Sequence, residues 1–81
     1  MVHVVLASDF AVHTDGVTRL EVEADTLGRL IGALEQRFPG FAQAVAPRMA
    51  AAIDGEIHHD DLATPIGAAS EVFLIPRIGG G

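Results

Sequence analysis

One stripe of apolar residues at helical spacing limits the folds that this chain can adopt. Its members lie at positions i, i+3, i+4, i+7 and i+11 and are Leu27, Leu30, Ile31, Leu34 and Phe38. Asp25 or Thr26 can cap the first turn, and Phe38-Pro39 ends the helix because the residue before a proline avoids the α region. A single amphipathic helix covers one face of one sheet, so the opposite face stays open unless a partner covers it.

Strand-like segments precede this helix. Val2, Val4 and Leu6 share one face of a strand predicted over residues 2–8, and residues 17–23 alternate in the same way. The Asp15-Gly16 pair between the two segments is a strong turn signal. The sequence therefore predicts an opening hairpin.

Short strands also follow the helix. Residues 41–47 are expected to form a short second helical turn. Residues 48–54 are rich in alanine, which favours helix, but the run is short and ends at the turn signal Asp54-Gly55, so we interpret it as a strand paired with residues 56–58. Residues 71–75 form the last strand. This order predicts an α+β fold with a mixed sheet of four to five strands and one main helix packed on one face.

The composition is that of one globular domain with few options for chemistry. The chain has 81 residues, of which 49% are hydrophobic and 20% charged, as expected of a single folded unit. It has no cysteine, and therefore no thiol nucleophile, thiolate metal site or disulfide. A net charge of −6 with five basic residues argues against nucleic acid or an anionic membrane as a partner. Without a membrane-spanning stretch or a signal peptide, a cytoplasmic location is expected.

The last five residues, Arg77-Ile78-Gly79-Gly80-Gly81, directly follow an apolar strand. Glycine has no Cβ, so such a tail can pass through a narrow channel and present its carboxylate to an enzyme inside a partner. The alternative is a frayed end, which is common at chain termini. The strand before the tail favours the first interpretation, and we divide the chain into a body, residues 1–76, and a reactive tail, residues 77–81.

Strand parity predicts a binding surface beside this tail. If Val72 and Leu74 face the helix, then Phe73 and Ile75 face the open side of the sheet, where Val5 of the first strand can join them. Large apolar residues on an open face suggest a partner-binding patch. The alternatives are the reversed parity or a loop that shields Phe73.

The residues between this patch and the glycines are expected to control how the tail leaves the body. Pro76 fixes φ and cannot extend the sheet ladder, so we expect strand pairing to stop there. Ile78 is expected to bind the entrance of a partner's channel by burial, and Arg77 either to pair with an acidic group or to stay solvated, since exposed ion pairs contribute only about 0–1 kcal/mol. The predicted partner-binding residues are Val5, Phe73, Ile75, Pro76, Arg77, Ile78 and Gly79.

The run His58-His59-Asp60-Asp61 contains several potential metal ligands. Adjacent residues on a strand point to opposite faces, so a solvated loop is the stronger interpretation and no metal site is expected. The carboxylates elsewhere are scattered, without a pair suited to acid–base catalysis, and no P-loop motif is present. We therefore expect no bound cofactor.

Two segments resemble the MoaD/ThiS family of ubiquitin-like sulfur-carrier proteins. Ile53-Asp54-Gly55-Glu56 is similar to the family's strand-and-turn element, with Asp where Asn is usual, and residues 71–80 are similar to its closing strand, proline and glycines. Arg77 replaces a second proline, and three glycines stand where the family has two. The resemblance covers essentially the whole chain and implies the β-grasp fold. The length and the helix ending in Phe38-Pro39 look more like the small subunit of molybdopterin synthase than the shorter thiazole-pathway carriers.

This resemblance also implies a chemistry at the C-terminus. The carboxylate of Gly81, with Gly80 beside it, would be adenylated with ATP by an E1-like activating enzyme, and sulfur would then replace AMP to give a thiocarboxylate. The carrier would be a co-substrate, and its second partner would be the molybdopterin synthase large subunit or another sulfur-accepting synthase. A carrier for thiamin-thiazole or cysteine synthesis, a protein modifier and a β-grasp interaction module without acyl chemistry are the alternatives.

Overall fold

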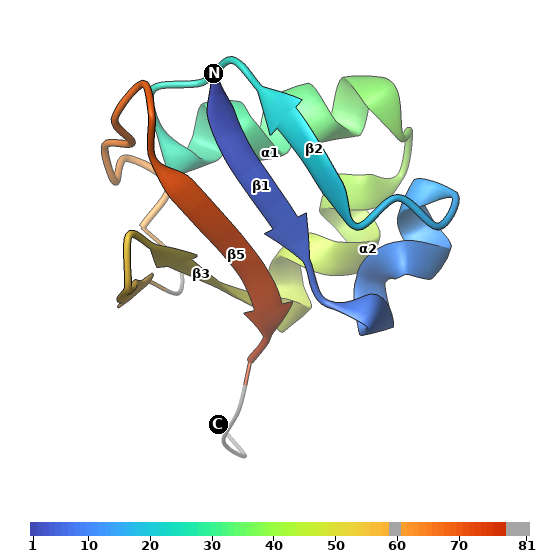
Figure 1. Ribbon diagram of the computed structural model, residues 1–81. Coiled ribbons are helices and arrows are strands. Elements are labelled where there is room, and N and C mark those ends of the chain that lie inside the picture. The colour runs from blue at the N-terminus through green and yellow to red at the C-terminus, as the bar shows by residue number, and fades with distance from the viewer. Residues whose placement is uncertain (59–60, 78–81) are drawn as a thin grey trace.

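Five strands form one mixed sheet in the order β2-β1-β5-β3-β4, and the computed structural model describes residues 1–58 and 61–77 (Figure 1). The strands are β1 (Val2–Leu6), β2 (Arg19–Val22), β3 (Met49–Ile53), β4 (Glu56–His58) and β5 (Glu71–Pro76). The helices are α1 (Leu27–Arg37) and α2 (Phe41–Val45), with two 3-10 segments, η1 (Ser8–Thr14) and η2 (Ala46–Arg48). The predicted α+β fold, with one main helix on one face of a mixed sheet, is confirmed.

The last strand lies in the centre of the sheet. β5 pairs in parallel with β1 on one side and antiparallel with β3 on the other, whereas β2 and β4 are edge strands. Parallel neighbours need a long crossover, which here contains the helices. The chain therefore leaves the body from the middle of the sheet and not from an edge.

The core lies between the sheet and the helices behind it in Figure 1. The inner face of β1 contributes three residues that are almost completely buried, Val2, Val4 and Leu6. The helical stripe contributes Leu27, Leu30, Ile31 and Leu34, which are also buried. Phe38, the last member of the stripe, is half-buried at the end of α1. The apolar periodicity in the sequence thus correctly predicted which face of the helix is buried.

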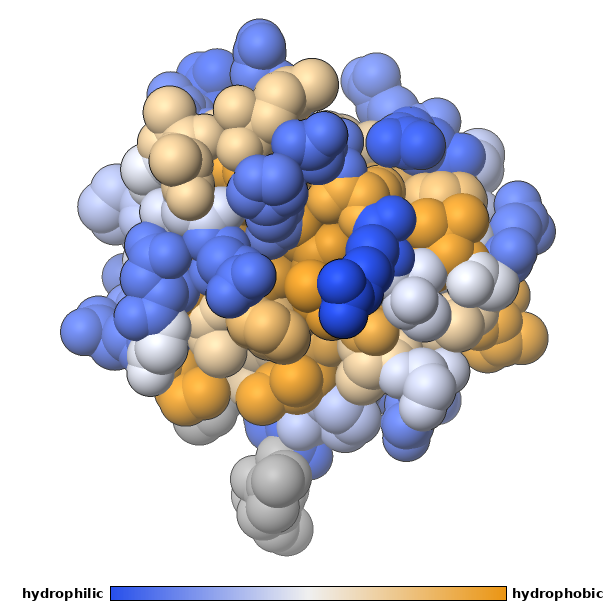
Figure 2. All heavy atoms as spheres, viewed as in Figure 1, coloured by the Kyte–Doolittle hydropathy of each residue, from blue (hydrophilic) through white to orange (hydrophobic). Residues whose placement is uncertain are grey.

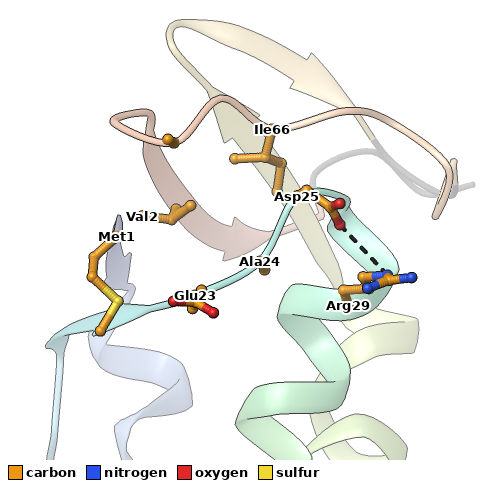
Figure 3. Close-up of a pocket in the computed structure, with 8 residues that line it drawn as sticks. Met1, Val2, Glu23, Ala24, Asp25, Arg29 and Ile66 are labelled. Atoms are coloured by element: carbon orange, nitrogen blue, oxygen red, sulfur yellow. Dashed lines mark ion pairs between the residues drawn. The ribbon is translucent and has the colours of Figure 1, made fainter.

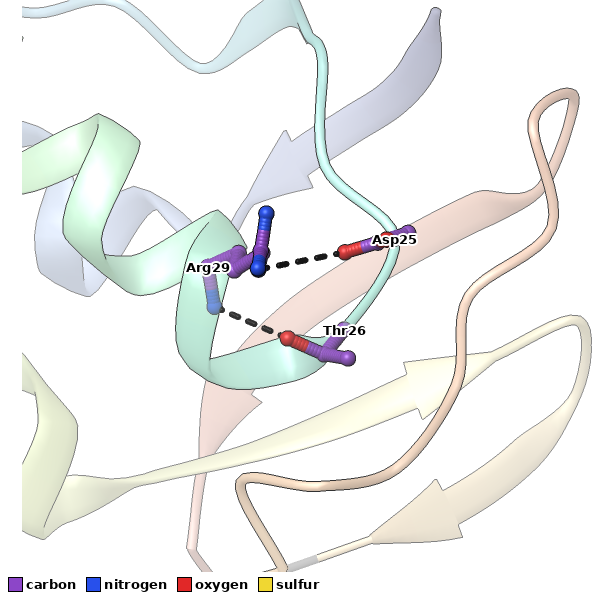
Figure 4. A network of polar contacts seen from close by, with 3 residues as sticks. All are labelled: Asp25, Thr26 and Arg29. Carbon is purple, nitrogen blue, oxygen red and sulfur yellow. Dashed lines mark hydrogen bonds and ion pairs between the residues drawn. The ribbon is translucent and has the colours of Figure 1, made fainter.

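The first turn of α1 is closed by Thr26 and by a distant part of the chain. The Thr26 hydroxyl oxygen accepts a hydrogen bond from the Arg29 amide (3.2 Å), and Arg29 also forms an ion pair with Asp25 (3.5 Å; Figure 4). The first two helical amides donate to the carbonyls of Thr64 (3.0 Å) and Leu62 (2.8 Å). These contacts satisfy donors that a helix start otherwise leaves without partners. The irregular connection before β5 therefore fixes the helix against the sheet.

The opening hairpin exists, but its connection differs from the prediction. The first strand ends at Leu6, and residues 8–14 form the 3-10 segment η1. Thr14 is buried there and its hydroxyl donates to the Val17 carbonyl (2.7 Å). A polar side chain that bonds the backbone in this way favours a turn over a continued strand. The predicted turn itself is present, since Asp15 has a φ of 54° and Gly16 a φ of 84°.

Two carboxylates join separate elements by accepting backbone amides. Glu35 near the end of α1 accepts from the amides of Gly40 (2.8 Å) and Ala42 (2.9 Å), so it caps the start of α2. Both hydrogen bonds lower the pKa of the Glu35 carboxyl, and the bond from the Gly40 amide has the larger effect. The predicted short helical segment after Gly40 is confirmed, and this carboxylate fixes its place.

The second joining carboxylate is Asp54, in the predicted two-residue turn between β3 and β4. Asp54 and Gly55 have φ values of 49° and 89°, so both occupy the left-handed region that such turns require. The Asp54 carboxylate accepts from the Glu71 amide (3.0 Å) and the Ser70 hydroxyl (2.7 Å). Both hydrogen bonds lower the pKa of the Asp54 carboxyl, and the bond from the Glu71 amide has the larger effect. The turn is thereby tied to the start of the central strand.

Candidate functional site

The tail begins at the end of the central strand. The Arg77 amide donates to the Arg48 carbonyl (2.7 Å), and the Arg77 guanidinium donates to the Met49 carbonyl (3.3 Å). Pairing therefore continues one residue past Pro76, and the prediction that it stops there is wrong. Pro76 lies opposite Met49, between two hydrogen-bonded pairs of the antiparallel ladder, where no amide donor is needed.

The remaining predicted tail residues, Ile78, Gly79, Gly80 and Gly81, lie outside the described residues. Their predicted roles in docking and acyl chemistry stay predictions. The structure places the point from which they start, because the Arg77 amide is bonded to the carbonyl of Arg48, the residue just before β3.

The registers of the strands define the open face of the sheet. Across the middle of this face run Arg19, Val5, Phe73, Ala52 and Ile57, one residue from each strand in the order of the sheet. The predicted parity of β5 is confirmed, because its alternate residues Val72 and Leu74 are completely buried against the helices whereas 40% of Phe73 is exposed. No loop shields Phe73 among the residues that the structure describes.

An apolar patch occupies this face next to the start of the tail. We define it as Val5, Ala52, Ile57, Phe73 and Ile75. Phe73 and Ile57 are its exposed members, at 40% and 53%, and the others are half-buried. Figure 2, which views this face, shows apolar residues in its middle, with hydrophilic side chains around them and one strongly hydrophilic side chain lying across them. The three predicted members thus lie together on one surface.

The sequence analysis missed Ile57 and Ala52. A two-residue turn at Asp54-Gly55 fixes the register of its strands, and Ala52 is then opposite Ile57. Because Ala52 is also opposite Phe73, both missed residues belong to the open face. The turn signal in the sequence could have identified them once the pairing of β3 with β5 was known.

A charged row borders the patch on the side away from the tail. His3 lies between Glu21 on β2 and Glu71 on β5, and its Nδ1 atom is 3.6 Å from the Glu21 carboxylate. These side chains, with Arg19 and Val5, line a shallow hollow of about 400 Å³. The open face therefore has two glutamates, Glu21 and Glu71, at the end away from the tail, whereas Arg77 lies at the tail end.

A smaller hollow, of about 290 Å³, adjoins the start of the tail. Its lining includes Pro76 and Arg77, which we call the tail root, together with Arg48 before β3 and Asp9 and His13 of η1. No pattern in the sequence identifies Arg48 as part of this site. Its carbonyl accepts the Arg77 amide, so the two backbones lie side by side at the start of the tail.

The other end of the molecule has a hollow of about 380 Å³, shown in Figure 3. Met1, Glu23, Asp25 and Arg29 line it together with small and apolar residues. The Arg29 and Asp25 side chains pair with each other at its rim. It lies by the N-terminus and the start of α1, on the opposite side of the body from the tail root, so it has no part in the site at Arg77.

The described residues contain no group of three or more side chains placed to hold a metal ion. The Nε2 atom of His58 instead lies 3.1 Å from the carboxylate of Glu56 on the same strand. His59 and Asp60 of the predicted solvated loop lie outside the described residues. No helix in the part of the chain that the structure describes has the length and apolarity needed to span a membrane.

The fold and the site together define a β-grasp domain with an open sheet face and a C-terminal tail that begins at its central strand. A family model described as the ThiS family matches residues 7–81. The chain belongs to this family of ubiquitin-like proteins of the MoaD/ThiS sulfur-carrier and modifier class. A search of curated proteins finds no match.

Solved structures share the same architecture. CysO of Mycobacterium tuberculosis is 22% identical, with 96% of this chain and 100% of that chain covered and a TM-score of 0.84. A chain of the BexX/CysO complex of Amycolatopsis orientalis is 18% identical, covers 100% of both chains and has a TM-score of 0.85. SAMP1 of Haloferax volcanii is 25% identical, with 99% and 98% covered and a TM-score of 0.71. These similarities establish the β-grasp fold.

Proposed function

We propose that this protein carries sulfur as a thiocarboxylate on its C-terminal glycine, in the cytoplasm. The family match, which extends through Gly81, is the observation that supports the proposal most strongly. The geometry agrees with it, because the tail starts from the central strand beside an exposed apolar patch of the kind that marks interaction sites.

The chemistry explains why a protein without cysteine can carry sulfur. A carboxylate is a poor acyl donor because oxide would have to leave, whereas an acyl adenylate releases AMP. A sulfur donor then attacks the same carbon, and the product is a thiocarboxylate. The carrier supplies the carboxylate and the docking surface, while an E1-like partner supplies ATP and the nucleotide site. We propose no bound cofactor on the carrier itself.

For the acceptor, we propose a molybdopterin precursor held by a larger synthase subunit. The length of the chain and the helix end at Phe38-Pro39 support this branch. A cysteine or thiazole pathway would use the same thiocarboxylate. Sulfur transfer from the loaded carrier to each acceptor system, measured by product formation, distinguishes the three pathways. Transfer to the cysteine or thiazole system alone would reject the molybdopterin assignment.

A second candidate function is protein modification, since the matched structures include one named a small archaeal modifier protein. The same activated glycine would then form an isopeptide bond with a lysine of a target. Covalent adducts in a cell extract, detected by mass spectrometry, would support this function.

The central test is activation followed by intact mass measurement. Incubation with the activating enzyme, ATP and a sulfur donor should change the mass by replacement of one oxygen with sulfur. Gly80→Ala should block this change if the channel is narrow, whereas Gly32→Ala, which adds the same methyl group to an open surface of α1, should not. An unchanged mass of the wild-type chain, together with full partner function after deletion of Gly80 and Gly81, would reject the proposal.

A further inference from the structure

The five basic residues of this chain are all arginine, at positions 19, 29, 37, 48 and 77, and the 81 residues include no lysine. The guanidinium group stays protonated throughout the physiological range and is not a nucleophile. The ε-amine of lysine, in contrast, attacks activated acyl groups. A chain without cysteine or lysine thus has neither a thiol nor an ε-amine that could react with its own activated C-terminus.

The contacts of Arg29 and Arg37 do not require a guanidinium group, whereas the Arg77 guanidinium donates to the Met49 carbonyl (3.3 Å). All five arginines are exposed. Arg29 meets Asp25 through its Nε atom alone, at 3.5 Å, and Arg37 lies over the Phe38 ring at 5.8 Å. A lysine ammonium can make either contact, because it pairs with a carboxylate as a point charge and also binds aromatic faces.

Arg48 and Arg77 lie beside the start of the tail, where a lysine would be best placed to react with the activated C-terminus. The Arg48 carbonyl accepts the Arg77 amide at 2.7 Å, and both residues line the hollow beside the tail root. The acyl carbon of Gly81 is four residues beyond Arg77 in the sequence. Four fully extended residues span at most about 14 Å, and this length is the upper limit on the separation between the backbone of Arg77 and that carbon.

We propose that arginine at the tail root, Arg48 above all, keeps positive charge beside the activated C-terminus while preventing its self-acylation. This inference rests on the proposed acyl activation. In the prevented step, a lysine ε-amine attacks the acyl carbon and forms a C–N bond. The acyl–oxygen bond to AMP breaks, AMP leaves with the electron pair, and the amine proton passes to water. The product would be a cyclic chain that is inactive as a carrier.

A chemically prepared donor tests this inference without the activating enzyme. The full chain is made as a C-terminal thioester by intein cleavage with 2-mercaptoethanesulfonate, and its intact mass is followed at about pH 8. A short flexible linker gives an effective concentration in the mM range. At about 10 μM protein, Arg48→Lys should therefore form amide roughly 100-fold faster than intermolecular reaction allows.

The wild-type thioester should only hydrolyse to the acid, whereas Arg48→Lys should give a product lighter than the acid by one water, with the new bond mapped to position 48. Arg29→Lys is the matched control, since it places the same amine by the hollow at the opposite end of the body. Equal amide formation in Arg48→Lys and Arg29→Lys, or rapid self-acylation of the wild type, would overturn the inference. Failure of the proposed function would instead appear as absent activation by the enzyme.

Discussion

Replacement of Phe73 by threonine separates the role of this side chain in binding from its role in folding. Phe73 is 40% exposed and lies opposite Val5 and Ala52 on the neighbouring strands. Threonine retains a preference for strands, and each lost cross-strand pair costs about 0.2–1 kcal/mol. We therefore expect a loss of about 1 kcal/mol in the free energy of unfolding, which lowers the Tm of a domain of this size by about 4–8 °C.

The matched control is the next residue of the same strand. Leu74 is completely buried, and Leu→Ala at such a site costs about 2–5 kcal/mol. Urea unfolding of both variants measures the difference. If Phe73→Thr destabilises the protein as much as Leu74→Ala does, Phe73 is a core residue and the reasoning about the open face is refuted.

Partner binding should depend more on the Phe73 side chain than on the Leu74 side chain, which is the opposite of the order expected for stability. Loss of an aromatic anchor at the centre of an interface typically costs at least 2 kcal/mol, or about 30-fold in Kd. Calorimetric titration of the activating enzyme with Phe73→Thr, under conditions where the variant is folded, measures this change. An unchanged Kd would remove Phe73 from the docking surface.

Two further predictions concern contacts that join the elements. Because hydrogen bonds from Glu71 and Ser70 hold the folded-state pKa of Asp54 below its usual value, their stabilisation is complete above that value and is lost as the pH falls through the lower folded pKa. Acid should therefore reduce the urea midpoint of the wild type more than that of Asp54→Asn, and parallel pH profiles would contradict this. Gly32→Ala should stabilise α1 by about 0.5–1 kcal/mol, but a Cβ on Gly28 would lie 3.1 Å from the carbonyl oxygen of residue 62. Thermal unfolding should consequently rank Gly28→Ala below Gly32→Ala, and equal Tm values would show that the connection moves freely.

Local patterns predicted most of the elements because short-range chemistry decides them. The stripe from Leu27 to Leu34 identified the buried helix face, and Asp54-Gly55 is one of the residue pairs that tolerate two successive left-handed conformations. The connection between β1 and β2 was harder to predict. Residues 8–14 lack a strong helical or strand period, and their 3-10 conformation depends on the buried Thr14 hydroxyl.

The sequence by itself determined the alternation of Val72, Phe73, Leu74 and Ile75, and hence that one pair of these residues is buried while the other faces outward. It also determined the absence of thiol and ε-amine nucleophiles. Only the tertiary structure decided which strands lie beside β5, because pairing joins residues far apart in the chain. That pairing adds Ile57 and Ala52 to the patch and places Arg48 at the tail root. It also continues past Pro76, since an antiparallel ladder needs an amide donor only at alternate residues.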